Sequence, residues 1–383
     1  MGNEISNIRA QIDAIDEQLT ELLKRRLALL ADMAEIKRRE GKAVFDPERE
    51  REVLNRVTNL AGPDCETEIR LLFSTLFNLS KARQRLLLEE ASPLTSAIAA
   101  EAREERLFPE RSPVACAGIE GSYAQQAASR MFRAPAILCF DNLDKVFEAV
   151  ESGRCPFGIL PIENSAAGSV GAVYDAMVKR HFYIVKSLRL RINDVLLGNP
   201  GATLGGIREL SSHPHALAQC SGFLRKHPEI KPCPLADTAV AAKELAESGR
   251  LDTAAIAPRA CAELYGLEIL DDDISDTQQN YMRFICISKN LQVFKGARKL
   301  SVMLALPHKP GSLNELLARF SAIGVNLTKL ESRPLPGSDL EFLFAFDFEA
   351  SPRDERAMRL LAELSHNPEI THFTFLGAYG EEN

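Results

Sequence analysis

The sequence predicts a multidomain chain with three parts: an all-α N-terminal region, an α/β middle region and an α+β C-terminal region of the ferredoxin-like type. Three observations support this prediction. The first ninety residues repeat apolar side chains at helical spacing, residues 113–290 alternate apolar strands with helical stretches, and residues 299–378 read strand–helix–strand–strand–helix–strand. At 383 residues, the chain is also too long for one ordinary domain.

Composition restricts the classes of function. Hydrophobic residues make up 45% of the chain, which is sufficient for packed cores, and a net charge of −7 disfavours general affinity for nucleic acid or acidic membranes. The 8 cysteines are scattered, without a Cys-x-x-Cys pair or a Cys/His cluster at metal-ligand spacing, and no apolar run is long enough to span a bilayer. We therefore expect a cytoplasmic protein without nucleic-acid or membrane partners.

The first helix carries cations on its apolar side. Apolar residues recur in alternating steps of four and three from Ile8 to Leu22, which is typical of the seam of a packed helix. Continuing these steps puts Arg26 and Lys37 on or beside the buried stripe, and about three helical turns separate them, so both point the same way. Because a buried, unpaired cation is costly, the pattern predicts an anionic partner.

The length of this helix favours a dimer. No Gly or Pro interrupts the chain before Gly41, so the helix could extend for about 50 Å. A lone globule of ninety residues cannot cover such a helix, whereas a partner chain can. Arg9 lies roughly 25 Å from Arg26 along the axis. The two arginines could therefore bind one small ligand only across a dimer.

Two further helices complete the N-terminal region. The second begins after Asp46 with Pro47 at the first helical position, and the third covers about 65–88, with Ser80 and Gln84 one turn apart. A helical dimerisation module with buried ion pairs would produce the same spacing.

With these residues, region 5–88 resembles the all-helical class of chorismate mutase. The resemblance places the family's binding positions on eight residues of this chain: Arg9, Arg26, Lys37, Asp46, Arg49, Glu50, Ser80 and Gln84. Chorismate rearranges without nucleophile or proton transfer, so the enzyme must hold a dicarboxylate in a compact conformer and stabilise charge on the breaking ether oxygen. The resemblance implies that Lys37 and Gln84 donate to this oxygen. It also implies that Glu50 with Asp46 faces the ring hydroxyl and that Arg9 comes from the partner.

A charged, partly helical linker precedes the middle region, in which one strand ends in polar residues. The apolar run from Phe157 to Ile162 stops at Glu163, Asn164 and Ser165. In open α/β sheets, ligands bind at the carboxyl ends of strands, and the helix expected at about 170–179 would favour an anionic ligand there. A plain strand–turn–helix corner, capped by the asparagine and the serine, explains the pattern equally well.

Four more polar stretches precede helices or strands of the middle region, at 118–123, 212–220, 237–239 and 280–284. Together with 161–165, they resemble prephenate dehydratase, a fold of two α/β lobes around a cleft, as in periplasmic binding proteins. The implied reaction removes CO₂ and the ring hydroxyl from prephenate, which requires a proton donor and a dry setting. The resemblance implies catalytic roles for Asn164, Ser165 and Arg283. It implies substrate binding by Ser122, Glu163, His213, Gln219 and Phe284.

Two positions depart from the dehydratase pattern. Met282 stands where the family motif Thr-Arg-Phe has threonine, the proposed donor to the leaving hydroxyl, and a thioether can donate nothing. His215 stands where glutamine commonly follows His-Pro. Either another residue replaces the lost hydroxyl, or the domain binds prephenate and dehydrates it slowly. The candidates for replacement are Ser122, Asn164, Ser165 and His215. In the slow case, Met282→Thr would raise the dehydratase rate and leave the mutase unchanged.

The C-terminal region has a turn at Pro336 and Gly337 between its second and third strands. Its first helix start and its second strand resemble the ACT regulatory domain, which binds phenylalanine at a domain–domain interface. An amino acid needs an anion-binding helix start for its carboxylate and acceptors for its ammonium group. The implied regulatory residues are Gly311, Ser312, Leu313, Asn326, Glu331 and Ser332. A dimerisation sandwich without a ligand would show the same pattern.

The sequence therefore predicts a member of the bifunctional chorismate mutase–prephenate dehydratase family, inhibited by phenylalanine and forming a homodimer or a larger homo-oligomer. It predicts no metal or organic cofactor. The expected units are the mutase at 1–90, a linker at 91–112, the dehydratase at 113–292 and the ACT domain at 298–380. Two alternatives are a mutase with a catalytically weak, prephenate-binding middle domain, and a non-enzymatic amino-acid sensor. The complete set of mutase positions argues against the sensor.

Overall fold

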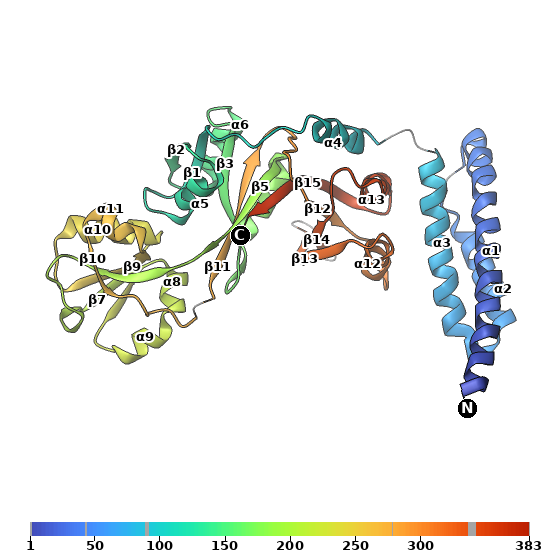
Figure 1. Ribbon diagram of the computed structural model, residues 1–383, viewed down its shortest axis with the longest axis horizontal. Coiled ribbons are helices and arrows are strands. Elements are labelled where there is room, and N and C mark those ends of the chain that lie inside the picture. Colours follow the sequence, from blue (N-terminus) through green and yellow to red (C-terminus); the bar gives the residue numbers. More distant parts are fainter. Residues whose placement is uncertain (1, 43, 89–91, 278, 336–341, 383) are drawn as a thin grey trace.

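The protein is described by a computed structural model that covers residues 2–42, 44–88, 92–277, 279–335 and 342–382. The helical N-terminal unit lies at one end of an elongated molecule, the two lobes of the middle region lie at the other end, and the C-terminal unit lies between them (Figure 1). The turn expected at Pro336 and Gly337 is outside the described residues. No helix among the described residues is long and apolar enough to cross a membrane.

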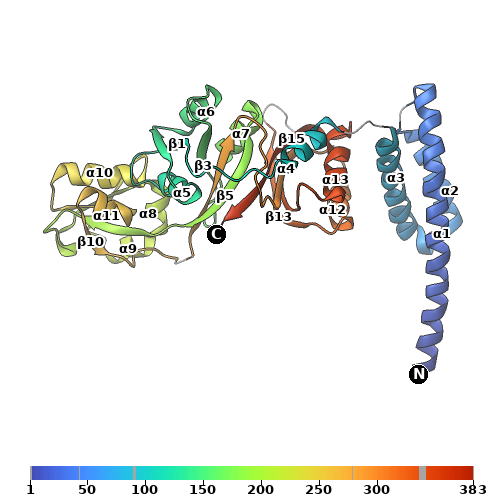
Figure 2. The same cartoon turned by 45° about the horizontal axis from the view of Figure 1, so that its top comes forward.

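Three helices form the N-terminal unit: α1 (Gly2–Glu40), α2 (Pro47–Ala61) and α3 (Glu66–Leu88), with a short 3₁₀ turn at Pro63–Cys65. The predicted helices are confirmed, and Asp46 caps α2 by accepting from Arg49 N at 3.0 Å. Helix α3 packs against both others, while the N-terminal half of α1 extends beyond them (Figure 2). The apolar seam there is exposed in the single chain, with Ile8 and Leu22 each 58% exposed.

Helix α4 (Pro93–Arg103) occupies the expected linker and packs against the C-terminal unit. Its Ile98 is fully buried in the same hydrophobic cluster as Leu300 and Phe346. This part of the linker is therefore an anchored element rather than a free tether.

The first lobe of the middle region has a sheet with helices on both faces. Its strands are β1 (Pro113–Ala117), β2 (Ala136–Phe140), β3 (Phe157–Asn164), β4 (Gly168–Ser169), β5 (Tyr183–Arg191) and β11 (Tyr281–Ser288). Its helices are α5 (Tyr123–Met131), α6 (Leu143–Glu151) and α7 (Gly171–Arg180). Helix α7 begins against the Arg333 side chain of the C-terminal unit, so the anion site expected at this helix start has a protein cation beside it.

The second lobe is a five-stranded sheet in the order β10-β6-β9-β7-β8. Its strands are β6 (Asp194–Gly198), β7 (Glu209–Ser212), β8 (Lys231–Pro234), β9 (Thr253–Pro258) and β10 (Glu268–Asp271). Its helices are α8 (Pro214–Gln219), α9 (Ser221–Lys226), α10 (Thr238–Ser248) and α11 (Ala260–Tyr265), with a 3₁₀ turn at Leu204–Gly206. The chain enters this lobe between β5 and β6 and returns between β10 and β11.

The C-terminal unit has the predicted βαββαβ order: β12 (Lys299–Ala305), α12 (Ser312–Ala322), β13 (Asn326–Pro334), β14 (Phe342–Glu349), α13 (Glu355–His366) and β15 (Thr371–Glu382). Strand β15 extends further than the sequence predicts. Its end pairs in parallel with β5, Gly380 opposite Lys186, so one sheet continues from the C-terminal unit into the first lobe. Gly377 permits this approach, because a Cβ there would lie 2.2 Å from the carbonyl oxygen of Ile184.

Candidate active sites

In the helical unit, the two predicted cations point toward the other helices. Arg26 Nη1 donates to Ser80 Oγ at 2.5 Å, and Lys37 Nζ donates to the carbonyl oxygen of Val44 at 2.7 Å. Burial lowers the pKa of both Arg26 and Lys37, and for Lys37 the charges of Asp46 and Glu50 oppose this effect. Both cations are partly withdrawn from water, as a site for an anionic ligand requires.

Polar residues of α2 and α3 surround these cations. Gln84, 6% exposed, donates through Nε2 to the Ser80 carbonyl oxygen at 3.3 Å, and its buried Oε1 has no partner among the described residues. Glu50 Oε1 lies 3.3 Å from Lys81 Nζ. The sequence analysis missed Lys81, although it directly follows Ser80, because it falls outside the positions that the mutase pattern marks.

Two predicted mutase residues, Arg49 and Arg9, lie away from the cations and polar residues just described. Arg49 points outward and pairs with Glu52 at 2.7 Å. Arg9 is exposed on the part of α1 that extends beyond the other helices. In the single chain, Arg26 and Lys37 are therefore surrounded by polar residues of α2 and α3, but Arg9 is not among the residues near them.

In the middle region, a chain of three amides connects the lobes. Asn164 Nδ2, at the end of β3, donates to Asn280 Oδ1 at 2.9 Å, and Asn280 Nδ2 donates to Gln219 Oε1, at the end of α8, at 2.7 Å. Asn164 and Asn280 are 6% and 3% exposed. Asn164 Oδ1 also accepts from the backbone N–H groups of Ala166 and Ala167. We call this place, where the lobes meet around the amide chain, the lobe junction.

The predicted serines and histidine act locally as caps and turn contacts. Ser165 Oγ accepts from Tyr281 N at 2.9 Å and donates to the Gln279 carbonyl oxygen at 3.4 Å. Ser122, 3% exposed, caps α5 by accepting from a backbone N–H, and no described residue accepts the proton of its own hydroxyl. His213 begins α8, as predicted, with Nδ1 accepting from His215 N at 3.2 Å.

The strand β11 directs its motif residues to opposite faces of the sheet. Met282 and Phe284 belong to the hydrophobic cluster under α5, which also includes Tyr123, and Phe284 is a core residue with 3% exposure. Arg283 points the other way, as neighbouring residues of a strand do. It pairs with Asp347 at 2.5 Å, donates to Tyr379 Oη at 2.7 Å and lies 2.9 Å from Glu381.

These three partners of Arg283 all belong to the C-terminal unit, and Arg283 itself is 5% exposed. Its fourth contact, Glu163 at 3.7 Å, is also bound by Lys329 of β13 at 3.1 Å. The predicted catalytic Arg283 and substrate-binding Glu163 therefore face the C-terminal unit, whereas their neighbours Met282 and Asn164 do not. The contacts favour a positioning role for both.

The six predicted regulatory residues lie on two elements, the start of α12 and the strand β13. Ser312 and Leu313, at the start of α12, line a cavity of about 360 Å³ together with Phe342 and Phe344, and Gly311 precedes them as the cap of that helix. Glu331 instead faces the first lobe, where it contacts Ser169 and Lys329. Asn326, at the other end of β13, donates to Glu349, and Ser332 pairs in register with Phe344.

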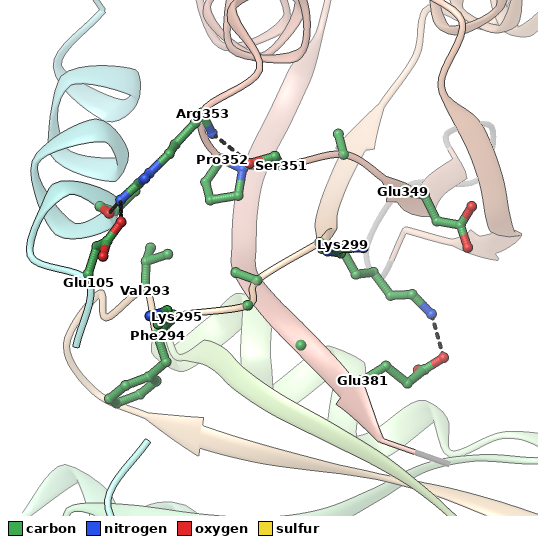
Figure 3. Close-up of a pocket in the computed structure, with 16 residues that line it drawn as sticks. Glu105, Val293, Phe294, Lys295, Lys299, Glu349, Ser351, Pro352, Arg353 and Glu381 are labelled. Carbon is green, nitrogen blue, oxygen red and sulfur yellow. Dashed lines mark hydrogen bonds and ion pairs between the residues drawn. The ribbon is translucent and has the colours of Figure 1, made fainter. Parts of the chain in front are cut away.

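A larger groove of about 1070 Å³ lies between α4, the segment 293–299 and the segment 349–353. Figure 3 shows Lys299 and Glu381 turned toward each other on one side of this groove, with Arg353 beside Glu105 on another. These pairs are 2.7 and 2.8 Å apart. These four charges are thus paired within the protein, and the groove is a junction between units.

Comparison with known proteins identifies the family. Residues 8–85 match the family chorismate mutase type II, and residues 114–292 match the family prephenate dehydratase. The bifunctional chorismate mutase/prephenate dehydratase of Pseudomonas aeruginosa is 30% identical over 385 residues, which cover 98% of this chain and 98% of that protein. This chain belongs to the bifunctional chorismate mutase/prephenate dehydratase family. It is an enzyme with a chorismate mutase domain and a prephenate dehydratase domain.

Two other similarities cover part of the chain. The arogenate dehydratase/prephenate dehydratase 2 of Arabidopsis thaliana is 36% identical over 282 residues, covering 70% of this chain and 73% of that protein. The crystal structure of a prephenate dehydratase from Arthrobacter aurescens in complex with L-Phe has a TM-score of 0.63 and 32% identity. The match covers 70% of this chain and 89% of that one.

Proposed function

We propose that each activity belongs to one unit: the chorismate mutase to residues 1–90, the prephenate dehydratase to residues 113–292 and phenylalanine inhibition to an ACT domain at 298–380, in a cytoplasmic enzyme. Residues 91–112 would connect the first two units. The proposal rests on the contacts within each unit. In the helical unit, Arg26 and Gln84 both hydrogen-bond to Ser80, and Lys37 lies near the charges of Asp46 and Glu50. In the middle region, the amide chain joins the two lobes.

For the mutase, the charged groups account for a reaction without proton transfer. Arg26 suits a carboxylate of chorismate, because its planar guanidinium can donate two parallel hydrogen bonds. Lys37 and Gln84 would stabilise negative charge on the ether oxygen as its bond to carbon breaks. The exposed seam of α1 supports a dimer in which the partner covers this helix and supplies Arg9.

For the dehydratase, the amide chain would bind and orient prephenate. Asn164, Asn280 and Gln219 come from both lobes, so a substrate held by them would also hold the lobes together. Amides donate and accept hydrogen bonds without titrating, which suits a site that must bind carboxylates and then release one as CO₂. Ser122 is the predicted site residue whose proton the local contacts leave available.

For the regulation, the C-terminal unit would bind phenylalanine and act on the dehydratase through β15 and Arg283. Two observations support this: the L-Phe complex of a relative, and the contacts that join Asp347, Tyr379 and Glu381 to the strand carrying Met282. The regulatory residues are spread over the start of α12 and the length of β13 in one chain, so a phenylalanine site that uses all of them would need residues of a second copy.

The test is to supply chorismate to the purified protein and to measure prephenate and phenylpyruvate over time, with and without phenylalanine. We expect phenylpyruvate to form and phenylalanine to suppress its formation. Accumulation of prephenate without phenylpyruvate would contradict the dehydratase assignment and would still support the mutase assignment. Supplying arogenate in a parallel reaction tests whether this chain shares the substrate named for the Arabidopsis relative.

A further inference from the structure

The dehydration of prephenate needs a proton for the departing hydroxyl, and the contacts at the lobe junction exclude several donors. Met282 has no proton to give. The Ser165 hydroxyl already donates to a backbone carbonyl. The His213 ring accepts a backbone hydrogen bond at Nδ1, so its proton is on Nε2, and the N–H of a neutral imidazole is a very weak acid. Burial also lowers the pKa of His213. Asparagine amides are too weakly acidic to serve. The Ser122 hydroxyl keeps its proton, and a carboxyl group beside the amide chain would be a stronger acid than this alcohol.

Asp194 is such a group. It begins β6, directly after the chain crosses from the first lobe to the second, and the preceding Ile192 donates its N–H to the Asn280 carbonyl oxygen at 2.8 Å. Tyr123 of α5 donates its hydroxyl to Asp194 Oδ1 at 2.9 Å and accepts from Asn193 N at 2.9 Å. Asp194 is thus held between both lobes, next to the backbone of the amide chain.

We propose that Asp194 is the general acid of the dehydratase reaction and supplies the proton that the threonine hydroxyl would have given. The proposal rests on the dehydratase activity of the middle domain. Asp194 gives its proton to the ring hydroxyl as the C–O bond breaks, so water leaves with that electron pair. The bond between the ring and its carboxylate breaks at the same time; its electrons complete the aromatic ring and CO₂ departs. The Asp194 carboxylate then regains a proton from solvent.

The surroundings of Asp194 suit a carboxylic acid. Burial raises the pKa of Asp194 to about 6, assisted by the charge of Asp237 and opposed by the Tyr123 hydrogen bond. Among the described residues, Oδ2 has no hydrogen-bond partner, which leaves this oxygen able to carry the proton. The other titratable groups around it are Asp237, Tyr123, Cys220 and Cys261, and burial raises the pKa of the last three. These three stay neutral near pH 7, so Asp237 is the group in this set whose charge acts on Asp194.

The decisive variant is Asp194→Asn, which keeps the shape and the acceptor for Tyr123. Because general acids contribute about 10²–10⁴-fold to a rate, we expect dehydratase kcat to fall by at least about 10²-fold, with the KM for prephenate nearly unchanged. The mutase activity of the same chain is the internal control and should not change. Glu363→Gln, which alters a buried carboxylate paired with Arg319 in the C-terminal unit, is the matched control and should keep both activities.

Two further measurements separate an acid from a merely structural residue. The double variant Asp194→Asn with Met282→Thr should have a dehydratase kcat at least about tenfold higher than that of Asp194→Asn alone, because a hydroxyl donor returns. The parent dehydratase kcat should fall as the pH rises through about 6, and this fall should be absent from the double variant. A parent-like rate in Asp194→Asn would overturn the proposal. So would a loss that Met282→Thr cannot rescue and that is accompanied by loss of prephenate binding. A parent that makes prephenate and never phenylpyruvate would refute the dehydratase function itself, and this proposal with it.

Discussion

The two candidate active sites of this chain are built from different kinds of side chain. The mutase group consists of charged side chains on three helices, and helical spacing alone indicates that Arg26 and Lys37 point the same way. The lobe junction consists of neutral amides and one acid with a raised pKa, brought together from β3, α8, β6 and the residue that precedes β11. Charges on a helix can be recognised from their period, whereas a site made by long-range contacts depends on which strands become neighbours. The surroundings of the two sites also differ, because β11, which follows Asn280 of the junction, carries an arginine that is buried against the C-terminal unit, Arg283.

The largest expected effect tests this contact with the C-terminal unit. Asp347 is 3% exposed and pairs with the buried Arg283. Because Asp347→Ala leaves that cation without its main partner, we expect a loss of about 3–5 kcal/mol in the stability of the joined dehydratase and C-terminal units. Denaturant unfolding followed by hydrogen exchange should show the loss there, with α1–α3 unaffected. Equal loss of protection in the helices would contradict the independence of the two sites.

The next effect concerns the mutase alone. Lys37→Ala removes one donor to the developing negative charge, which in other enzymes costs about 10²–10³-fold in rate. We expect a fall of this size in chorismate kcat/KM and no change in the rate on added prephenate. Lys24→Ala is a suitable control, because this exposed lysine of α1 has Glu21 as its only ion-pair partner among the described residues. A Lys37→Ala enzyme that rearranges chorismate at the parent rate would refute the assigned role.

A smaller effect is expected at the junction. Asn280→Ala removes both hydrogen bonds of the central amide and leaves Asn164 Nδ2 and Gln219 Oε1 without that partner. An unsatisfied buried polar group costs about 1–3 kcal/mol, so prephenate kcat/KM should fall about 10–100-fold. Chorismate conversion, measured in the same preparation, should be unchanged. If both activities fell together, a general folding defect would be the better explanation.

The sequence predicted the local structure more fully than the junction. The three N-terminal helices, the start of α2 at Pro47 and the βαββαβ order follow from residues close together in the chain, and the structure confirms them. The pairing of β15 with β5 could not be predicted, because the short segment 377–382 shows no strand alternation of its own. The direction of Arg283 was missed for a similar reason: a motif names its residues and does not say which sheet face each one will occupy.

Asp194 shows where sequence reasoning lost a candidate. Asn193 and Asp194 are polar residues between two apolar strands, a pattern that marks most surface turns. Only the fold brings Tyr123, seventy-one positions earlier, against this carboxylate. The sequence signal that could have suggested Asp194 is indirect. Because Met282 replaces the expected hydroxyl donor, an acid is required elsewhere in the site, and Asp194 is an acidic residue at the entry to the second lobe.

The smallest expected effect is also the most discriminating. If Asp194 is the proton donor, Met282→Thr in the otherwise unchanged chain adds a second donor to a site that already has one. We then expect dehydratase kcat to change by less than about tenfold, well below the 10²–10⁴-fold that a general acid contributes. A rise of about 10²-fold or more would favour the alternative in which the middle domain binds prephenate and dehydrates it slowly. The mutase rate should stay constant in either case, since Met282 lies in β11, outside the helical unit.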